Sequence, residues 1–325
     1  MNSTSNYAFA VLGNAVVDGI AHVDDALLAR FSLKKGDSNT LSHAQMLELS
    51  NAITVEQFRA GGAAANTAYT LAKLGSRVAF IGQIGTDPTG RFFVEDMLAA
   101  GITLTPPMAT SRTTDIFTLL ADDGTRTMVQ CLPPPASTDD SWIDDNLIEQ
   151  ANYLIIESYV VASHPAAVEY AARHATHHGK RLVVSLASPR AVQAGLAVLT
   201  DIILTHSPLV IGNQSEWEVL LKGNDPHTSK KLEALERVIT RSGNGAAYYT
   251  ANGGNVVDSP TQPIPRPTDL TGAGDAFAAG FLHVFMGGGS AQLALQQGHQ
   301  LGRAVVLQLG PRLQSVPEVT VPHSD

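Results

Sequence analysis

Cysteine, long apolar runs and clustered positive charge are all scarce in this sequence. Cys131 is the only cysteine among 325 residues, so no disulfide can form within the chain and a reducing compartment is expected. No apolar run approaches the roughly 18 residues of a membrane-spanning helix. Residues 1–6 also lack the basic start of a secretory signal. We therefore expect a cytoplasmic protein without a membrane partner.

Positive charge is too sparse to suggest a nucleic-acid partner. The 21 Lys and Arg residues are scattered and the net charge is −9, so there is no basic stripe to follow a phosphate backbone. Two nucleotide-binding signatures are missing as well. No P-loop sequence occurs, and Gly272-Ala273-Gly274 is followed by Phe277 where a dinucleotide fingerprint needs glycine. The 44% hydrophobic content instead indicates a globular protein with a substantial core.

Short apolar runs alternate with helical patterns over most of the chain. This rhythm predicts an α/β fold, with a mostly parallel central sheet and helices on both faces. The expected strands are residues 7–12, 77–81, 153–156, 181–185, 202–204, 209–211 and 246–250. The expected helices are residues 63–74, 90–100, 165–178, 216–221, 229–240 and 275–286.

Two segments interrupt this rhythm and predict a small second sheet. Residues 15–60 contain only short apolar runs, and part of residues 111–132 reads as a β-hairpin around Asp122-Asp123-Gly124-Thr125. Strands from both segments are expected to pair into a lid. Pro133-Pro134-Pro135 then ends the hairpin. We expect one domain over residues 6–321, with residues 315–325 as a loose end or an edge strand.

A turn of small residues leads directly into an apolar helix at Asp269–Phe281. Such a turn leaves backbone N–H groups at the positive end of the helix dipole, where anions bind. Asp275 lies in the first helical turn, where a carboxylate can take a proton from an attacking hydroxyl. These features suit phosphoryl transfer to an alcohol. A tight turn with an acid that only favours the dipole is the structural alternative.

A second glycine-rich turn precedes a helix at Gly61-Gly62. Paired glycines allow close approach of the backbone to a ligand. Asn66 follows one helical turn later, where its amide can bind a hydroxyl. An ordinary turn followed by an exposed asparagine remains an equal alternative.

Four motifs in order and spacing carry a resemblance to a known family. They are Gly-Gly-x-x-x-Asn at residues 61–66, Gly-x-x-Gly-x-Asp-x-x-Gly at 82–90, Asn-x-x-Glu at 213–216 and Asp-x-Thr-Gly-Ala-Gly-Asp at 269–275. The chain resembles the ribokinase-like (PfkB) family of small-molecule kinases from about Phe9 to Pro311. The resemblance implies a ribokinase-like fold and an ATP-dependent phosphotransferase that uses Mg²⁺.

The resemblance also implies roles for residues on the nucleotide side. Asp275 corresponds to the catalytic base, and the N–H groups of Gly272, Ala273 and Gly274 correspond to the anion hole. Asn213 and Glu216 would hold Mg²⁺ largely through water. The nucleotide would further contact Thr240, Gly245, Gly272, Gly274 and His299. Asp269 and Thr271 would help to bind K⁺, as in some members.

Acceptor-binding roles follow in the same way. Asn14 and Asp18 correspond to the pair after the first strand, where carboxylate oxygens can accept hydrogen bonds from a diol. The other positions implied to contact the acceptor are Gly61, Gly62, Asn66, Arg126 and Tyr159. Tyr159 could stack on a base, with a buried core tyrosine as the alternative. Arg126 could reach substrate or phosphate, with a solvated charge as the alternative.

Several features are similar to the adenosine kinase branch of that family. They are the Gly13–Asp18 start, the long segment that follows it, Leu186-Ala187-Ser188-Pro189 without a sugar-kinase acid, and Gly298-His299. Ser242 departs from the usual glycine of the ATP-base loop. Adenosine is the first expected acceptor, followed by another nucleoside, then fructose or ribose. A non-catalytic nucleoside sensor is a remote alternative, and either a monomer or a homodimer is expected.

Three histidines gather at the end of one expected helix. His174, His177 and His178 are spaced i, i+3 and i+4, which places them on neighbouring surface positions. This spacing can bind a metal, but the motif contains no carboxylate. A solvated helix end that favours the dipole is the preferred interpretation.

Overall fold

The computed structural model describes residues 6–108, 113–131, 140–313 and 315. Its main sheet has nine strands in the order β14-β13-β12-β11-β10-β9-β1-β5-β6. All neighbours from β12 to β6 are parallel, and β13 and β14 add an antiparallel end. The strands are β1 (Tyr7–Leu12), β5 (Val78–Ile81), β6 (Thr103–Leu104), β9 (Ala151–Glu157), β10 (Arg181–Ser185), β11 (Leu209–Asn213), β12 (Arg237–Thr240), β13 (Ala246–Tyr249) and β14 (Val256–Ser259).

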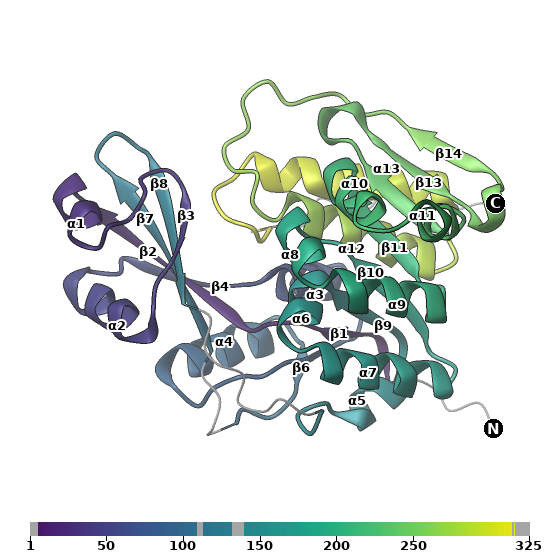
Figure 1. Cartoon of the computed structure of the whole chain (residues 1–325), viewed down its shortest axis with the longest axis horizontal. Coiled ribbons are helices and arrows are strands. Elements are labelled where there is room, and N and C mark those ends of the chain that lie inside the picture. The colour runs from purple at the N-terminus through teal and green to yellow at the C-terminus, as the bar shows by residue number, and fades with distance from the viewer. Residues whose placement is uncertain (1–5, 109–112, 132–139, 314, 316–325) are drawn as a thin grey trace.

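Helices cover both faces of this sheet (Figure 1). Because side chains alternate along a strand, Phe9 and Val11 of β1 join one core, and Ala10 and Leu12 join the other. The first face carries α3 (Ala63–Lys73), α4 (Pro88–Ala99), α12 (Ala273–Met286) and α13 (Ala291–Val306). The second carries α5 (Asp145–Glu149), α6 (Ser158–Ser163), α7 (Pro165–His177), α8 (Pro189–Ala194), α9 (Leu196–His206), α10 (Gln214–Lys222) and α11 (Pro226–Glu233).

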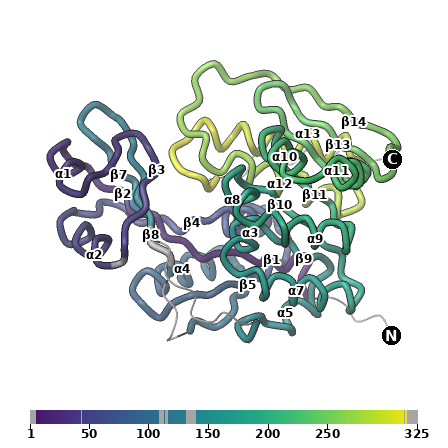
Figure 2. The backbone as a smooth tube through the Cα atoms, in the orientation of Figure 1, coloured from purple at the N-terminus to yellow at the C-terminus, as the bar shows by residue number. Residues whose placement is uncertain are grey.

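A second sheet of five strands, in the order β3-β8-β7-β2-β4, projects from the main body (Figure 2). Its strands come from the two segments that interrupt the βα rhythm. They are β2 (Val16–Val23), β3 (Ser38–Thr40), β4 (Gln57–Gly61), β7 (Thr114–Ala121) and β8 (Arg126–Cys131). One face packs on α1 (Asp25–Arg30) and α2 (His43–Ala52). Short 3₁₀ turns at Ser242–Asn244 and Ala251–Gly253 flank β13.

The predicted fold class is confirmed, but two expected elements are wrong. Residues 202–204 belong to α9 rather than to a strand, because Ile202 and Ile203 are buried on a helix against the second core. A short apolar run does not distinguish these two states. The helix expected at residues 229–240 ends at Glu233, and Arg237–Thr240 form β12 instead. There the pairing with β11 and β13 overrides the local pattern.

Some expectations fall outside the described residues. Leu132, Pro133-Pro134-Pro135 and nearly all of residues 315–325 belong to this group. The single-domain boundaries at 6 and 321 stay a prediction. Within the described ranges, no helix is both long enough and apolar enough to cross a lipid bilayer.

Candidate active site

The first turns of α3 and α12 bring two motif residues into contact. The Asn66 side-chain amide donates a hydrogen bond to Asp275 Oδ2 over 3.0 Å, although the residues lie 209 positions apart. The Thr67 hydroxyl donates to the Asp275 carbonyl at 3.5 Å. Asn66 therefore contacts the candidate base directly, whereas the sequence suggested a hydroxyl of the acceptor as its partner.

The turn before α12 requires glycine at position 272. Gly272 is the N-cap residue with φ +78°, and a Cβ there would lie 2.5 Å from the Pro311 carbonyl oxygen. Ala273 N–H donates to the Leu270 carbonyl at 3.3 Å. Among the described residues, the N–H groups of Gly272 and Gly274 have no partner. Of the three N–H groups expected in the anion hole, those of Gly272 and Gly274 are thus free among the described residues and that of Ala273 is not.

The paired-glycine turn lies beside the end of β1. Gly62 has φ +95°, and a Cβ there would lie 2.8 Å from the Asn14 carbonyl oxygen. Gly61 has open space around its Cα. Asn14 accepts a hydrogen bond from the Ser163 hydroxyl at 3.3 Å. Close packing of two backbone segments therefore accounts for glycine at position 62.

Burial raises the pKa of Asp275 to about 6, with the charge of Glu216 adding to the effect and the Asn66 hydrogen bond opposing it. The carboxylate is still ionised near neutral pH, and it is a stronger base than an exposed aspartate. Such a value suits a group that removes a proton from an alcohol.

A second buried carboxyl, Glu157, lies near Asp275 and was missed by the sequence analysis. It ends β9 and caps α6, accepting hydrogen bonds from the N–H groups of Tyr159 at 3.3 Å and Val160 at 3.2 Å. Burial raises its pKa to about 8, against these hydrogen bonds and with a contribution from the charge of Asp275. The available signal was an acid at the carboxyl end of a buried strand, where α/β sheets bind ligands.

Arg312, a second missed residue, fixes the orientation of the Asn66 amide. Its Nε donates to Asn66 Oδ1 at 3.3 Å, so the Asn66 Nδ2 group faces Asp275. The guanidinium also pairs with Asp96 and stacks over the Tyr69 ring at 4.7 Å. Arg312 is a positioning residue, and no motif in the sequence indicated it.

A cavity of about 470 Å³ opens beside the start of α12, within the range of small-molecule sites. Six residues expected on the nucleotide side line it: Asn213, Thr240, Gly245, Ala273, Gly274 and His299. Gly272 and Glu216 are not in its lining. His299 Nε2 lies 3.0 Å from the Ser259 carbonyl oxygen, and burial lowers the pKa of this imidazole, so the neutral ring is favoured.

Asn213 and Glu216 form a capping box at the start of α10. Glu216 N–H donates to Asn213 Oδ1 at 3.0 Å, and Asn213 N–H donates to Glu216 Oε2 at 2.8 Å. Burial raises the pKa of Glu216. The motif therefore has a local structural role, as a helix cap, in addition to the Mg²⁺ role that the resemblance implies.

Asp18 lies on the second sheet, opposite Arg59 in the register of β2 and β4. The Thr118 hydroxyl lies 3.0 Å from both carboxylate oxygens. Burial raises the pKa of Asp18 to about 6, partly offset by the Thr118 hydrogen bond and by the charges of Arg59 and Arg126. Sequence reasoning found Asp18 and missed Arg59, which lies on β4 two residues before the paired glycines at Gly61 and Gly62.

Arg126 connects the second sheet to the turn before α12. Its Nη1 lies 3.2 Å from Asp269 Oδ2, and the Asp269 side chain is only 4% exposed. The same carboxylate accepts hydrogen bonds from Thr271 and from the Gly310 N–H at 3.0 Å. Against burial, which would raise it, these bonds hold the pKa of Asp269 below its usual value. Potassium binding at Asp269 and Thr271 stays a prediction.

Tyr159, in the first turn of α6, is 45% exposed. It is therefore not a buried core tyrosine. Burial of part of its ring raises the pKa of its hydroxyl, so the phenol stays neutral at physiological pH. Its stacking on an acceptor base stays a prediction.

A family model described as pfkB family carbohydrate kinase matches residues 37–318. The chain belongs to this family. It is 24% identical to "Adenosine kinase 2" of Arabidopsis thaliana, over 98% of this chain and 99% of the relative. It is 27% identical to a "5-dehydro-2-deoxygluconokinase" of Bacillus velezensis, over 76% of this chain and 79% of the relative. The solved adenosine kinase of Sinorhizobium meliloti superimposes with a TM-score of 0.79 at 27% identity, covering 95% and 97% of the two chains.

This pfkB kinase is therefore a phosphotransferase, and its family implies ATP and typically Mg²⁺. The residues present fit both groups. The N–H groups of Gly272 and Gly274, which have no partner among the described residues, are donors suited to a phosphate at a helix start. Glu216 and Asn213 supply the hard oxygen donors that Mg²⁺ prefers. The similar proteins named above include kinases named for different acceptors, and all match at low identity. The comparisons therefore show a small-molecule kinase without identifying its acceptor.

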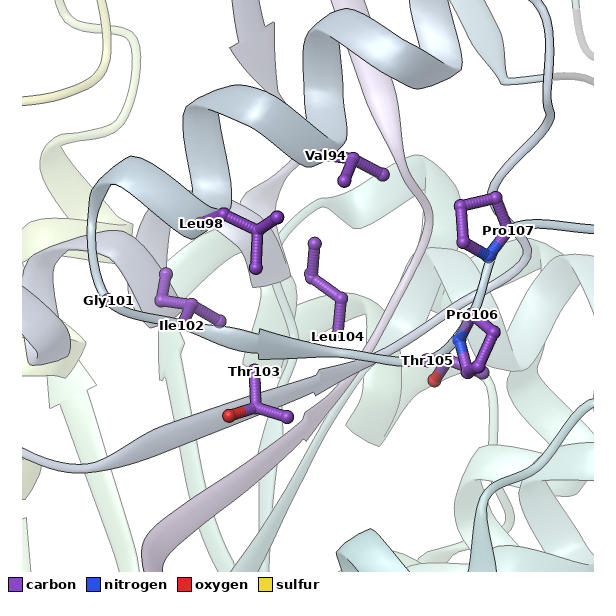
Figure 3. Close-up of a pocket in the computed structure, with 9 residues that line it drawn as sticks. All are labelled: Val94, Leu98, Gly101, Ile102, Thr103, Leu104, Thr105, Pro106 and Pro107. Atoms are coloured by element: carbon purple, nitrogen blue, oxygen red, sulfur yellow. The ribbon is translucent and has the colours of Figure 1, made fainter.

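A different pocket of this pfkB kinase lies between α4 and β6, at the edge of the main sheet (Figure 3). Its lining includes Val94, Leu98, Leu104, Pro106 and Pro107, and no ionisable side chain contributes to it. It therefore offers no acid, base or charged anchor for phosphoryl transfer.

Proposed function

We propose that this protein transfers the γ-phosphoryl group of ATP to the primary hydroxyl of a nucleoside, with adenosine as the first candidate. One observation carries the proposal. Asp275, with its pKa raised to about 6, directly follows the turn with the free N–H groups of Gly272 and Gly274, and Gly274 lines a cavity of about 470 Å³. A base next to an anion-binding helix start is the arrangement that phosphoryl transfer to an alcohol needs.

In this mechanism Asp275 Oδ accepts the proton of the attacking hydroxymethyl group. Asn66 holds the carboxylate by its amide hydrogen bond, and Arg312 holds the amide. The Gly272 and Gly274 N–H groups stabilise the negative charge that develops on the transferred phosphoryl. Asn213 and Glu216 would hold Mg²⁺, which would neutralise part of the charge on the phosphates.

Asp18 is proposed to bind two hydroxyls of the acceptor, because its oxygens can accept strong hydrogen bonds from a diol. Tyr159 is proposed to stack on a base, since its ring is exposed beside the site. Gly61, Gly62 and Asn14 would shape the backbone around the acceptor. Adenosine kinases among the similar proteins support a nucleoside.

A sugar acceptor is the second candidate. It is favoured by the similarity to a 5-dehydro-2-deoxygluconokinase at 27% identity. Asp18 would bind a diol of either acceptor, so Tyr159 is the residue that distinguishes them. Full activity of Tyr159→Ala with adenosine would remove the stacking role. A drop in kcat/KM confined to nucleosides would support it.

Replacement of Asp275 tests the proposed base. Asp275→Asn keeps the shape and the Asn66 contact, and turnover with Mg²⁺-ATP should fall by roughly 10²–10⁴-fold. Asp201→Asn, an exposed aspartate on α9, is the matched control and should keep full activity. Turnover of Asp275→Asn at the wild-type rate would overturn the assignment.

An acceptor panel decides the substrate. Adenosine, inosine, cytidine, ribose and fructose are each incubated with Mg²⁺-ATP, with K⁺ and again with Na⁺, and ADP formation is measured. Highest kcat/KM for adenosine is expected. A preference for ribose or fructose would move the assignment to a sugar kinase. Tight nucleoside binding with no ADP from any acceptor would favour the sensor.

A further inference from the structure

A group of metal-ligand side chains lies outside the kinase site, where the end of α5 meets the end of α7. We propose that Glu149, His174 and His178 form a zinc site there. The two helices pack side by side in the layer that covers the second core (Figure 1). The candidate kinase residues do not include any of the three.

The spacing of the ligand atoms fits one bound ion. Glu149 Oε1 lies 3.1 Å from His174 Nε2 and 3.5 Å from His178 Nε2. All three ligand atoms lie within 4.8 Å of one another. Ligands about 2.1 Å from a tetrahedral ion are about 3.4 Å apart, so the two separations from Glu149 need little adjustment. The i, i+4 spacing of the histidines places both rings on one side of the helix end.

Hydrogen bonding prepares His178 for metal coordination. Its Nδ1 lies 3.0 Å from the His174 carbonyl oxygen, so Nδ1 carries the proton in this contact. The lone pair of the neutral ring is then on Nε2, the atom that faces Glu149. Metal-binding histidines commonly have a backbone carbonyl as the partner of their other nitrogen.

Asp145 supplies a second, independent indication of a missing ligand. Its Oδ1 is buried and has no hydrogen-bond partner among the described residues, and it lies 3.8 Å from His174 Nε2. Tyr170 donates a hydrogen bond to the other oxygen at 2.8 Å and stacks on the His174 ring. This carboxylate is therefore held in place with one oxygen available as a fourth ligand.

Two imidazoles and carboxylate oxygens in a tetrahedral arrangement favour Zn²⁺. In the absence of metal, a proton on His174 Nε2 can satisfy the contact with Glu149, and zinc must displace it. The bound ion would connect α5, which precedes β9, to α7. We therefore expect zinc to stabilise the folded chain without taking part in phosphoryl transfer.

The test measures zinc binding to the full-length protein by competition with a chromophoric chelator, together with thermal unfolding. Wild type should bind one Zn²⁺ at this site, and zinc at 100 times its dissociation constant should raise the unfolding midpoint by about 3 °C. His174→Ala should weaken the binding at least tenfold and remove the shift. His177→Ala removes a neighbouring histidine outside the cluster and should leave both unchanged.

Co²⁺ absorption provides a second readout that does not depend on stability. Wild type should give the intense visible bands of a tetrahedral site, and both His174→Ala and His178→Ala should lose them. Equal zinc affinity in wild type and both variants would overturn the proposal. Equal loss in His177→Ala would also overturn it, since binding would then depend on the helix end rather than on these ligands. Kinase assays on His174→Ala keep this result separate from the proposed function.

Discussion

The two sheets of this protein differ in how many of their faces are buried. In the main sheet both faces are covered, and strands such as β5 are buried at every residue. The second sheet packs on α1 and α2 with one face only. Its other face carries Asp18, Thr118 and Arg126 among less buried neighbours such as Met128, which is 44% exposed.

The same division separates the proposed catalytic residues from the proposed acceptor-binding residue Asp18. Asp275 and its two N–H neighbours belong to elements packed on the doubly covered sheet, where side chains have little freedom. Asp18 belongs to the second sheet, which is joined to the turn before α12 by the ion pair between Arg126 and Asp269, and we expect this sheet to shift relative to the core. Closure of this sheet over bound acceptor, with exclusion of water, is a consequence that can be measured.

The largest expected effect on stability comes from the turn before α12, which packs on the main sheet. Gly272→Ala places a Cβ at φ +78° and within 2.5 Å of the Pro311 carbonyl oxygen. We expect a loss of about 3 kcal/mol in the free energy of unfolding, from left-handed strain and overlap, measured by denaturant titration. Gly274→Ala, with open space around it, is the control. Equal stability of the two variants would mean that the turn is not rigid.

Glu157→Gln tests how strongly burial at the end of β9 disfavours the charged form of Glu157. The pKa of this carboxyl is about 8 in the folded protein, above its ordinary 4.5. The folded state therefore binds the proton more tightly than the unfolded chain. Its contribution to stability is present below about pH 4.5 and is lost as pH rises to about 8.

Between pH 5 and pH 9 the wild type should lose a few kcal/mol of unfolding free energy relative to Glu157→Gln. Titration of Asp18, which does not contribute to the pKa shift of Glu157, is common to both proteins and cancels in the difference. Glu56→Gln, at an exposed carboxyl, should behave as wild type. Parallel stability curves for wild type and Glu157→Gln would show that the carboxyl is not desolvated.

On the open face of the second sheet, Asp18→Asn should act on binding. Loss of charge-assisted hydrogen bonds should raise the KM for acceptor by about 10–100-fold with little change in kcat. Asp122→Asn, in the hairpin turn of the same sheet, is the control. A fall in kcat with unchanged KM would place Asp18 in the chemical step and weaken the division between the two sheets.

The smallest effect concerns the contact between the sheets. Arg126→Gln removes a partner that is 38% exposed, and Asp269 keeps its hydrogen bonds from Thr271 and Gly310. We expect a loss of about 1 kcal/mol or less and faster amide hydrogen exchange in β7 and β8. Arg30→Gln, on α1, should not change this exchange. Unchanged rates in Arg126→Gln would show that the ion pair does not hold the second sheet.

Most of the fold could be predicted from the sequence, and so could the position of the candidate catalytic turn. Buried strands, glycine turns and the acid at a helix start are local patterns, and they identified β1, β5, the turn at Gly272 and Asp275. The strand predicted at residues 202–204 was wrong because a short apolar run fits a buried helix as well as a strand. The helix predicted to continue through Arg237–Thr240 was wrong because these residues form a strand whose pairing partners lie elsewhere in the chain.

The sequence by itself determined the βα order, the small-residue turn before α12 and an acid at its first helical turn, since these depend on neighbouring residues. Only the tertiary structure decided that Asn66 and Arg312 hold Asp275, that Glu157 lies desolvated near it, and that Glu149 completes the histidine cluster. Those features arise from packing between distant segments. Their distances and burial are set by the whole fold, and only Glu157, at the carboxyl end of a buried strand, left a local signal.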